Sequence, residues 1–402
     1  IGEDAFCQFL LNAIQTKMRL PFVSGEVVCS STDASVEWPE ALGVNRPAVK
    51  QSNTSIVFGE SFILKIYRRI QEGINPELEI GRFLTEVSSC KSIAPFAGSL
   101  EYQTDNCTTA IAVLHRYLPN QGTVWDYTQE YLDRCLKSCI NESDQVSEWS
   151  MHASYQSQMT ALGKCTADLH FALAKTTGDS AFDPETLPIN GISSQVQQLH
   201  TILAGNTNQL SSDTVQRLLT ALQRISEYLA TLQFHSCQLT VSRIHGDFHL
   251  DQILMVHSDF IIIDFEGDPN QPLEARRAKK LPLIDIANLS FSLCLVATQA
   301  QLRHLTEYTG HRDLFAASAR IWLTISAEAF LTGYCNTIAG CCTHPSDKGL
   351  TRHLLQFFLM KIILSRINDM DEDKAALVET SMLVLLDLFE QTELLSISNE
   401  EV

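Results

Sequence analysis

The chain has 402 residues, of which 45% are hydrophobic and 19% are charged, a composition that excludes a largely disordered protein. Its 47 acidic and 29 basic residues give a formal net charge of −18, so we expect neither nucleic acid nor an anionic membrane surface as a partner. A chain of this length usually forms more than one hydrophobic core, and we therefore expect two lobes.

The expected elements of the first 118 residues are a helix followed by a β-rich region. Apolar residues at helical spacing predict the helix, and apolar runs joined by short turns predict the strands. The elements are a helix within residues 1–20, strands at 55–58 and 62–67, a helix at 76–88, and strands at 97–102 and 109–117.

After residue 121 the pattern becomes mainly helical. Long helical patterns cover residues 152–175 and 211–232, with a polar linker at 175–188, and a β-rich hairpin interrupts them at 239–265. Strands gathered in one part of the chain and helices in the other predict an α+β fold, with a small β-rich lobe, a hinge and a larger helical lobe.

No segment predicts export or a membrane span. The N-terminus lacks a basic region followed by an apolar one, and the longest nearly apolar run, residues 354–364, is too short to cross a bilayer. The 12 cysteines form no CxxC pair, which favours reduced, mostly buried thiols. We therefore expect a cytoplasmic protein without a membrane partner. Because the chain begins at Ile1 rather than at Met, we expect it to be a fragment of a longer protein.

The segment RIHGDFHLDQIL (residues 243–254) and the FIIIDFEGD stretch after it carry the most informative pattern. Phosphoryl transfer from ATP needs one carboxylate that accepts or orients the proton of the attacking hydroxyl, and a carboxylate and an amide oxygen that hold Mg²⁺. The segment therefore predicts an ATP- and Mg²⁺-dependent kinase with Asp247 and His245 in the catalytic loop, and with Gln252 and Asp264 as metal ligands. The alternative, an accidental HGD turn beside a buried strand, explains the spacing of these groups less well.

A kinase of this type also needs a cation for the phosphates and an acid that holds the cation in place. Lys65 lies within an apolar strand, where an unpaired charge would be costly. Glu79 is a candidate partner on the following helix, and Glu77 and Glu86 compete for the same role. A lysine at a sheet edge pointing to solvent is the alternative interpretation.

The glycine-rich loop that usually covers the phosphates is absent, and no GxxxxGK[ST] motif occurs. The segment just before the first strand of the pair contains Ser52, Asn53, Thr54 and Ser55. Hydroxyls and backbone N–H groups can bind phosphate oxygens in place of a glycine loop, so we expect these residues at the nucleotide. A polar turn between strands would have the same composition.

Two further groups have less specific patterns. Asp285 is expected to brace the catalytic loop near His245 or Asp247. The basic pair Arg276 and Arg277 is expected in a solvated loop, with a substrate-facing arginine as the alternative.

The sequence resembles the maltokinases, including those fused behind trehalose synthase, from Gln51 to about Tyr334. The segments that carry the resemblance are QSNTSIVFG (51–59), ILKIYRR (63–69), GINPELEIGRFLTE (73–86), YLPNQGTVWDYT (117–128), LGKCTADLHFALA (162–174), RIHGDFHLDQIL (243–254), IIDFEGDPNQPLEARR (262–277), PLIDIA (282–287) and AFLTGY (329–334).

This resemblance implies a bilobal protein-kinase-like fold and transfer of the ATP γ-phosphate to the anomeric hydroxyl of maltose, giving maltose 1-phosphate for α-glucan synthesis. It implies Asp247 as the base, Lys65 as the phosphate anchor, and Glu79 as the preferred partner of Lys65. It also implies association or fusion with trehalose synthase. The expected domains are an N-terminal cap remnant at 1–48, a β-rich lobe at 49–118 and a helical lobe with the sugar site at 119–402.

The sequence departs from the family at residues 360–370, in the part expected to bind the sugar. Family members carry acidic and aromatic residues there, whereas this chain retains Lys361 and lacks those groups. A kinase for another acceptor such as glucosamine is therefore an alternative. A non-catalytic kinase-like domain attached to a glucan-metabolising enzyme is a second alternative.

Overall fold

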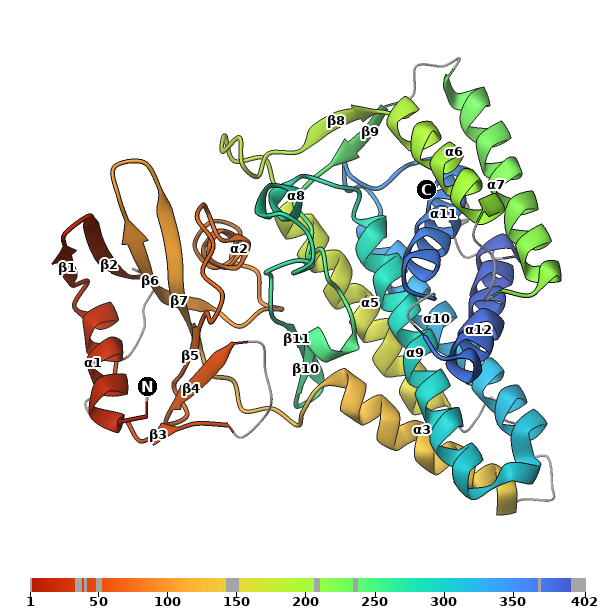
Figure 1. Cartoon of the computed structure of the whole chain (residues 1–402), viewed down its shortest axis with the longest axis horizontal. Coiled ribbons are helices and arrows are strands. Elements are labelled where there is room, and N and C mark those ends of the chain that lie inside the picture. Colours follow the sequence, from red (N-terminus) through yellow and green to blue (C-terminus); the bar gives the residue numbers. More distant parts are fainter. Residues whose placement is uncertain are drawn as a thin grey trace, which may run out of the picture. The chain divides into compact units, whose positions relative to one another are not determined.

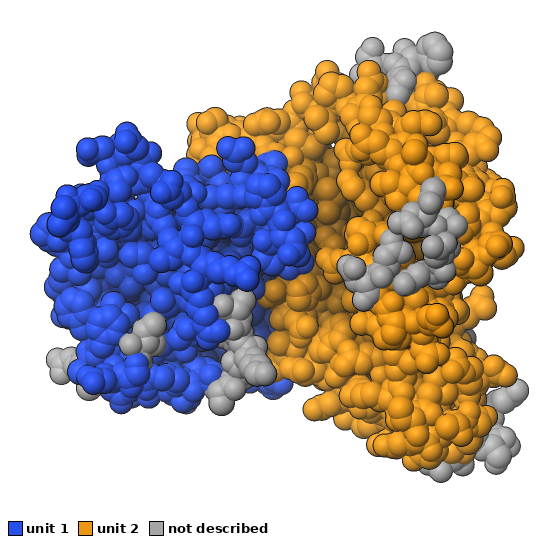
Figure 2. Space-filling view, viewed as in Figure 1, with its two compact units in different colours: residues 1–121, 245–247, 254–278 blue, residues 122–244, 248–253, 279–402 orange. Residues whose placement is uncertain are grey.

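The computed structural model describes residues 2–32, 38–39, 42–47, 53–141, 152–205, 210–233, 238–367 and 370–391 (Figure 1). The chain divides into two compact units (Figure 2). The first unit comprises residues 1–121, 245–247 and 254–278, and the second comprises residues 122–244, 248–253 and 279–402.

The first unit is built on a seven-stranded antiparallel sheet, among the described residues, with the order β1-β2-β6-β7-β5-β4-β3. Among the described residues, this unit also contains a hairpin of β10 and β11 and the α-helices α1, α2 and α8. The bounds are α1 Asp4–Gln15, β1 Arg19–Phe22, β2 Gly25–Ser31, β3 Val44–Asn45, β4 Thr54–Phe58, β5 Phe62–Ile66, α2 Pro76–Arg82, β6 Phe96–Gln103, β7 Thr108–Arg116, β10 Ile253–Val256, β11 Asp259–Ile262 and α8 Leu273–Arg277.

The two faces of this sheet are covered by different helices. On one face, Leu64 of β5 belongs to the same core as Ile14 of α1. On the other face, Val113 of β7 packs in a smaller core with Leu78 of α2. Lys65 lies directly opposite Val113 in the register of β5 and β7, and side chains paired in this way share a face. Lys65 is therefore on the face that α2 covers.

Helix α2 begins at a residue that its sequence specifies. Asn75 caps the helix, because its side-chain oxygen accepts a hydrogen bond of 2.8 Å from the N–H of Glu77. Pro76 follows at the first helical position, where its missing N–H costs nothing. After Arg82 the chain continues as a π-helical turn at Phe83–Val87. The predicted helix at 76–88 is therefore present, with a change of winding in its second half.

The second unit consists mainly of helices (Figure 1). Its elements are α3 Val124–Asn141, α5 Ala153–Leu173, β8 Glu185–Pro188, α6 Asn190–Gly205, α7 Ser212–Gln233, β9 Gln238–Val241, α9 Leu283–Glu307, α10 Arg312–Ile338, α11 Lys348–Arg366 and α12 Glu372–Gln391. Helices α5 and α10 cross at two glycines. A Cβ atom on Gly163 would lie 2.1 Å from the carbonyl oxygen of Phe330, and one on Gly333 would lie 2.0 Å from that of Thr160. Only glycine permits this close approach of the two backbones.

Several sequence expectations differ from the structure. The first helix ends at Gln15, and β1 and β2 follow it and extend the same sheet as β4–β7. The polar linker at 175–188 ends in strand β8, which pairs with β9. Much of the hairpin region that we grouped with the helical lobe, residues 254–278, belongs to the first unit instead. The three-domain division thus remains a prediction, and the compact units follow other boundaries.

Two stretches are long and apolar enough to cross a membrane by composition, Leu283–Glu307 and Thr309–Ile338, and the sequence analysis overlooked both. The apolar window of the first is 78% buried within the structure and that of the second is 50% buried. Core helices of a soluble protein meet the same criterion, so this is weak evidence for a membrane span.

The described cysteines form no disulfide with one another, and six of them are buried: Cys7, Cys29, Cys165, Cys294, Cys335 and Cys341. The expectation of mostly buried thiols holds only in part, because Cys342 is exposed and four others are half-buried. Cys237 lies outside the described residues.

Candidate active site

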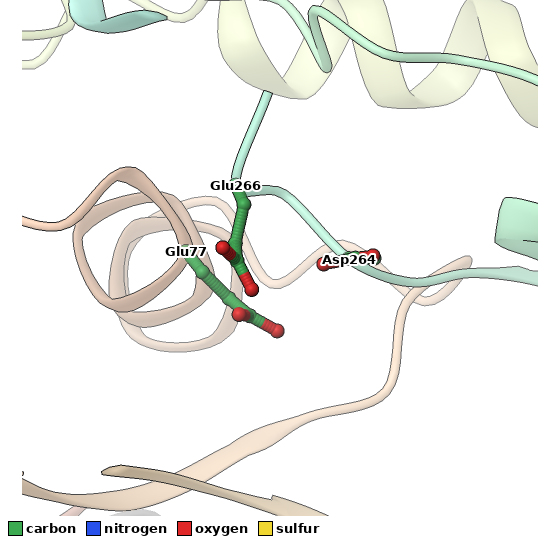
Figure 3. A group of neighbouring side chains, drawn as sticks. All are labelled: Glu77, Asp264 and Glu266. Carbon is green, nitrogen blue, oxygen red and sulfur yellow. The ribbon is translucent and has the colours of Figure 1, made fainter. Parts of the chain in front are cut away.

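Three carboxylates surround the ammonium group of Lys65 in the first unit. The Nζ atom lies 2.9 Å from Oε2 of Glu77, 2.5 Å from Oδ1 of Asp264 and 2.5 Å from Oε1 of Glu266. One oxygen from each acid lies within 4.8 Å of the others. Figure 3 shows Glu77 entering this group from α2, and Asp264 and Glu266 entering it from the segment after β11. We call these four residues the lysine–carboxylate cluster.

Further side chains hold Glu77 in place. The hydroxyl of Tyr67 donates to Oε2 of Glu77 at 2.8 Å, and Nε2 of His115 lies 3.6 Å from Oε1. The Glu77 side chain is only 4% exposed, and that of Lys65 is 17% exposed. Buried charges are tolerated when each has partners, and here both oxygens of Glu77 have one.

The cluster carries more negative than positive charge. Burial alone would lower the pKa of Lys65, but the carboxylates of Glu77, Asp264 and Glu266 raise it above its ordinary value. Burial would raise the pKa of Glu77, but Lys65 and His115 lower it below its usual range. Burial raises the pKa of Glu266 against the opposing ammonium of Lys65. A single lysine therefore does not neutralise the three acids.

Strand β11 carries Asp264 and Glu266 to Lys65. The N–H of Ile262, at the end of β11, donates to the carbonyl oxygen of Ser92 at 2.8 Å, which ties the strand to the chain segment after α2. Asp264 has a positive φ of 66°, an unusual backbone conformation for a residue other than glycine. Such conformations persist where the surroundings enforce them, and they are concentrated at functional sites.

His245 connects the predicted catalytic loop to this segment. Its Nε2 atom lies 2.9 Å from the carbonyl oxygen of Ile263, and its Nδ1 atom lies 3.3 Å from the N–H of Asp247. The carbonyl can only accept and the N–H can only donate, so the contacts match a neutral imidazole with its proton on Nε2. His245 is buried, and its ring packs against that of Phe265. It thus joins the backbone of Asp247 to the chain next to Asp264.

The predicted phosphate segment is partly described. Asn53 is buried and donates its amide N–H to Oε1 of Glu266 at 2.8 Å, so it lies at the lysine–carboxylate cluster. The hydroxyl of Thr54 accepts from Nε of Arg68 at 3.1 Å, and Ser55 lies opposite Lys65 in the register of β4 and β5. Ser52 lies outside the described residues.

Gln252, the other predicted metal ligand, belongs to the second unit. Its Nε2 atom lies 3.4 Å from Nε2 of His249. Its convergence with Asp264 on one metal ion therefore stays a prediction. Asp285 also belongs to the second unit, where Nε2 of the buried His170 lies 3.2 Å from its Oδ2 atom. The expected brace near His245 or Asp247 stays a prediction, and the contact with His170 is a further one that the sequence did not suggest.

The prediction that Glu79 pairs with Lys65 is wrong. Glu77 is the partner, and Glu79 instead binds Arg277 through two hydrogen bonds of 2.9 and 2.7 Å. Residues two positions apart on a helix point to different sides, so the two acids cannot both face Lys65. The expectation of a solvated Arg276–Arg277 pair is also wrong, because Arg277 binds Glu79 of α2.

Sequence reasoning also missed Glu266 as a member of the cluster. The signal that could have revealed it is its spacing, because Asp264 and Glu266 are two residues apart directly after an apolar strand. The alternation rule for extended strands does not by itself place both acids at Lys65, because the backbone at Asp264 is left-handed.

The donor set fits a hard divalent cation. Three carboxylates within 4.8 Å provide the oxygen ligands that Mg²⁺ and Mn²⁺ prefer, and the single ammonium leaves an excess of negative charge. Asp264 was the predicted metal ligand in this group, and an oxygen of Glu266 lies close enough to bind the same cation.

Comparison with known proteins finds that the chain is similar to glucosamine kinases. No protein-family model matches the chain. A glucosamine kinase from Mycolicibacterium smegmatis is 25% identical over 261 residues, covering 65% of this chain and 61% of that protein. A glucosamine kinase from Streptacidiphilus jiangxiensis is 24% identical over 294 residues, covering 72% of this chain and 61% of that protein. The match thus spans about three fifths of the length of these relatives.

A solved structure of a glucosamine kinase in complex with glucosamine, ADP and inorganic phosphate matches with a TM-score of 0.68. It is 20% identical, and the match covers 96% of this chain and 83% of that chain. A second crystal form of a glucosamine kinase has the same TM-score. The predicted bilobal, kinase-like α+β fold is thereby confirmed. The relatives also agree with the predicted class, a phosphotransferase that acts on an alcohol group, and they are named for glucosamine rather than for maltose.

Replacing Glu77 by Gln should change how stability depends on pH. The pKa of Glu77 is lowered in the folded state, so its stabilising effect is present above the unfolded value of about 4.3 and is lost as the pH falls below it. Breaking this buried pair should cost about 3 kcal/mol at pH 7. The difference from wild type should shrink between about pH 5 and pH 3.5, as measured by urea unfolding.

Glu86→Gln is the matched control, since Glu86 is exposed and lies on the π-helical turn that continues α2. It should follow the wild-type curve throughout. A Glu77→Gln protein that is destabilised by the same amount at every pH would contradict the assignment of a charged Glu77 to this pair.

Proposed function

We propose that the chain is an ATP- and Mg²⁺-dependent kinase that phosphorylates a hydroxyl group of glucosamine. The observation that carries the chemistry is the lysine–carboxylate cluster, a buried ammonium held by acids in the unit that also contains Asp247. The names of the curated relatives support glucosamine as the acceptor. Maltose is the second candidate, because the sequence motifs resemble those of maltokinases.

In this proposal each residue has a defined task. Lys65 anchors the phosphates of the nucleotide, and Glu77 holds the lysine side chain in place. Asp264 and Gln252 supply oxygen ligands for the metal ion, which when bound offsets the negative charge of the phosphates. Asn53, Thr54 and Ser55 bind phosphate oxygens, and the same role for Ser52, which lies outside the described residues, comes from the sequence alone.

Asp247 orients the acceptor hydroxyl and takes its proton. The hydroxyl oxygen forms the new bond to the γ-phosphorus, the bond from that phosphorus to the bridging oxygen of ADP breaks, and the proton passes to the carboxylate. Asp247 is held for this task by His245, which accepts a hydrogen bond from its backbone N–H. A non-catalytic domain would have no need to retain Lys65, Asp247 and Asp264 together.

The acceptor can be identified by measuring ADP release from Mg-ATP with glucosamine, N-acetylglucosamine, glucose and maltose in parallel. We expect the highest kcat/KM with glucosamine and a large loss with N-acetylglucosamine, in which the amine is acylated and uncharged. A higher kcat/KM with maltose would instead identify maltose as the acceptor. Absence of both turnover and Mg-ATP binding would favour the non-catalytic alternative.

Replacing Asp247 by Asn should lower kcat about 10²- to 10⁴-fold, the usual contribution of a positioned acid–base group. Mg-ATP affinity, measured by calorimetry, should stay close to that of wild type, since the side chain keeps its shape. Asp259→Asn is the control, because Asp259 is an exposed carboxylate on β11. Near wild-type turnover of Asp247→Asn would exclude Asp247 as the base.

A further inference from the structure

Two adjacent arginines on α8 contact the two chain segments that supply the acids of the lysine–carboxylate cluster. Nη1 of Arg276 donates to the backbone carbonyl oxygen of Glu266 at 3.0 Å. Arg277 binds Glu79 of α2 through Nε at 2.9 Å and Nη2 at 2.7 Å. We call Arg276 and Arg277 the arginine pair. All of these residues lie in the first unit.

The contacts of the arginine pair are specific in geometry. Two parallel N–H···O bonds between a guanidinium and a carboxylate fix the orientation of both groups, which a lysine could not do. The Arg277 side chain is 29% exposed and that of Glu79 is 11% exposed, so solvent screens this contact less than a surface pair.

Arg276 has a second set of contacts. Its guanidinium also donates to the side-chain oxygen of Gln71, just before α2. The stem of Arg276 lies against Gly267, where an added Cβ would come within 3.4 Å of the arginine Cβ. Gly267 has a φ of 71°, so a larger residue would be strained there as well as crowded. Arg276 thus holds the segment after Asp264 in place, through its hydrogen bond to the Glu266 carbonyl oxygen and its packing against Gly267.

These contacts connect the two elements that supply the cluster. Helix α2 carries Glu77 toward Lys65 and Glu79 toward Arg277. The segment after β11 carries Asp264 and Glu266, and Arg276 holds its backbone. The arginine pair therefore bridges the helix that carries Glu77 and the segment that carries the other two carboxylates.

We infer that Arg276 and Arg277 are positioning residues for the nucleotide and metal site, with Arg277 acting through Glu79 on the placement of Glu77. The inference rests on the proposed kinase function. Groups that orient metal-binding side chains typically contribute 10- to 100-fold to metal affinity or activity, and we expect an effect of this size here.

The test is a double-mutant cycle with Arg277→Ala, Glu79→Ala and the double variant, read out as the calorimetric Kd for Mg-ATP and as kcat and KM. If Arg277 and Glu79 act as one unit, each single variant should weaken Mg-ATP binding at least about tenfold. The double variant should then lose no more affinity for Mg-ATP than either single variant. Arg277→Lys should restore only part of the affinity, because lysine cannot make both bonds.

A charge swap, Glu79→Arg with Arg277→Glu, provides the rescue and should recover much of the binding lost in the single variants. Arg19→Ala is the matched control, because Arg19 forms an exposed ion pair with Glu26 at the edge of the same sheet. It should leave Kd and kcat unchanged. If Arg277→Ala does not fold, Glu79→Gln examines the same pair from its other side.

Three outcomes would overturn the inference. Unchanged Mg-ATP affinity in Arg277→Ala and Glu79→Ala would show that the contact between Arg277 and Glu79 is only structural. A loss in Arg277→Ala without a loss in Glu79→Ala would show that Arg277 acts directly on the nucleotide. A wild-type protein that binds no Mg-ATP would overturn the proposed function, and this inference with it.

Discussion

The buried ammonium of Lys65 is the interaction on which the arrangement of the first unit depends. A lysine in the middle of an apolar strand loses most of its hydration, and only nearby carboxylates can restore the free energy lost. Three acids from two separate parts of the chain provide this compensation. The need to pair one charge thus brings α2 and the segment after β11 to the same face of the sheet.

The same interaction leaves the cluster with unbalanced charge. Three carboxylates exceed one ammonium, and burial raises the pKa of Glu266 rather than letting solvent stabilise its charged form. A cluster of this kind favours a further positive charge, and closely spaced oxygen atoms suit a small divalent cation. The left-handed backbone at Asp264 and the histidine that joins it to Asp247 show that this segment is held in a defined conformation.

Much of the fold was predictable because local patterns determine local structure. Strands β4 to β7, helix α2 and the long helices α5 and α7 lie within a few residues of their expected positions, since alternating and 3.6-residue apolar patterns are strong signals. The strands β1 and β2 were missed because β1 is mostly exposed and β2 is mostly half-buried, so neither contains a run of buried apolar residues. Their apolar alternation is correspondingly weak.

The sequence alone indicated the candidate residues for the chemistry: a lysine in an apolar strand, an HGD loop, and an acid after a second apolar strand. It could not determine which acid meets the lysine, because Glu77 and Glu79 have the same side chain on the same helix. Tertiary structure decided this through the rotation of α2, which the Asn75 cap and the burial of Leu78 set. Once Glu77 faces Lys65, Glu79 must point elsewhere, because residues two apart on a helix point to different sides. Arg277, which is distant in the sequence, binds Glu79 there.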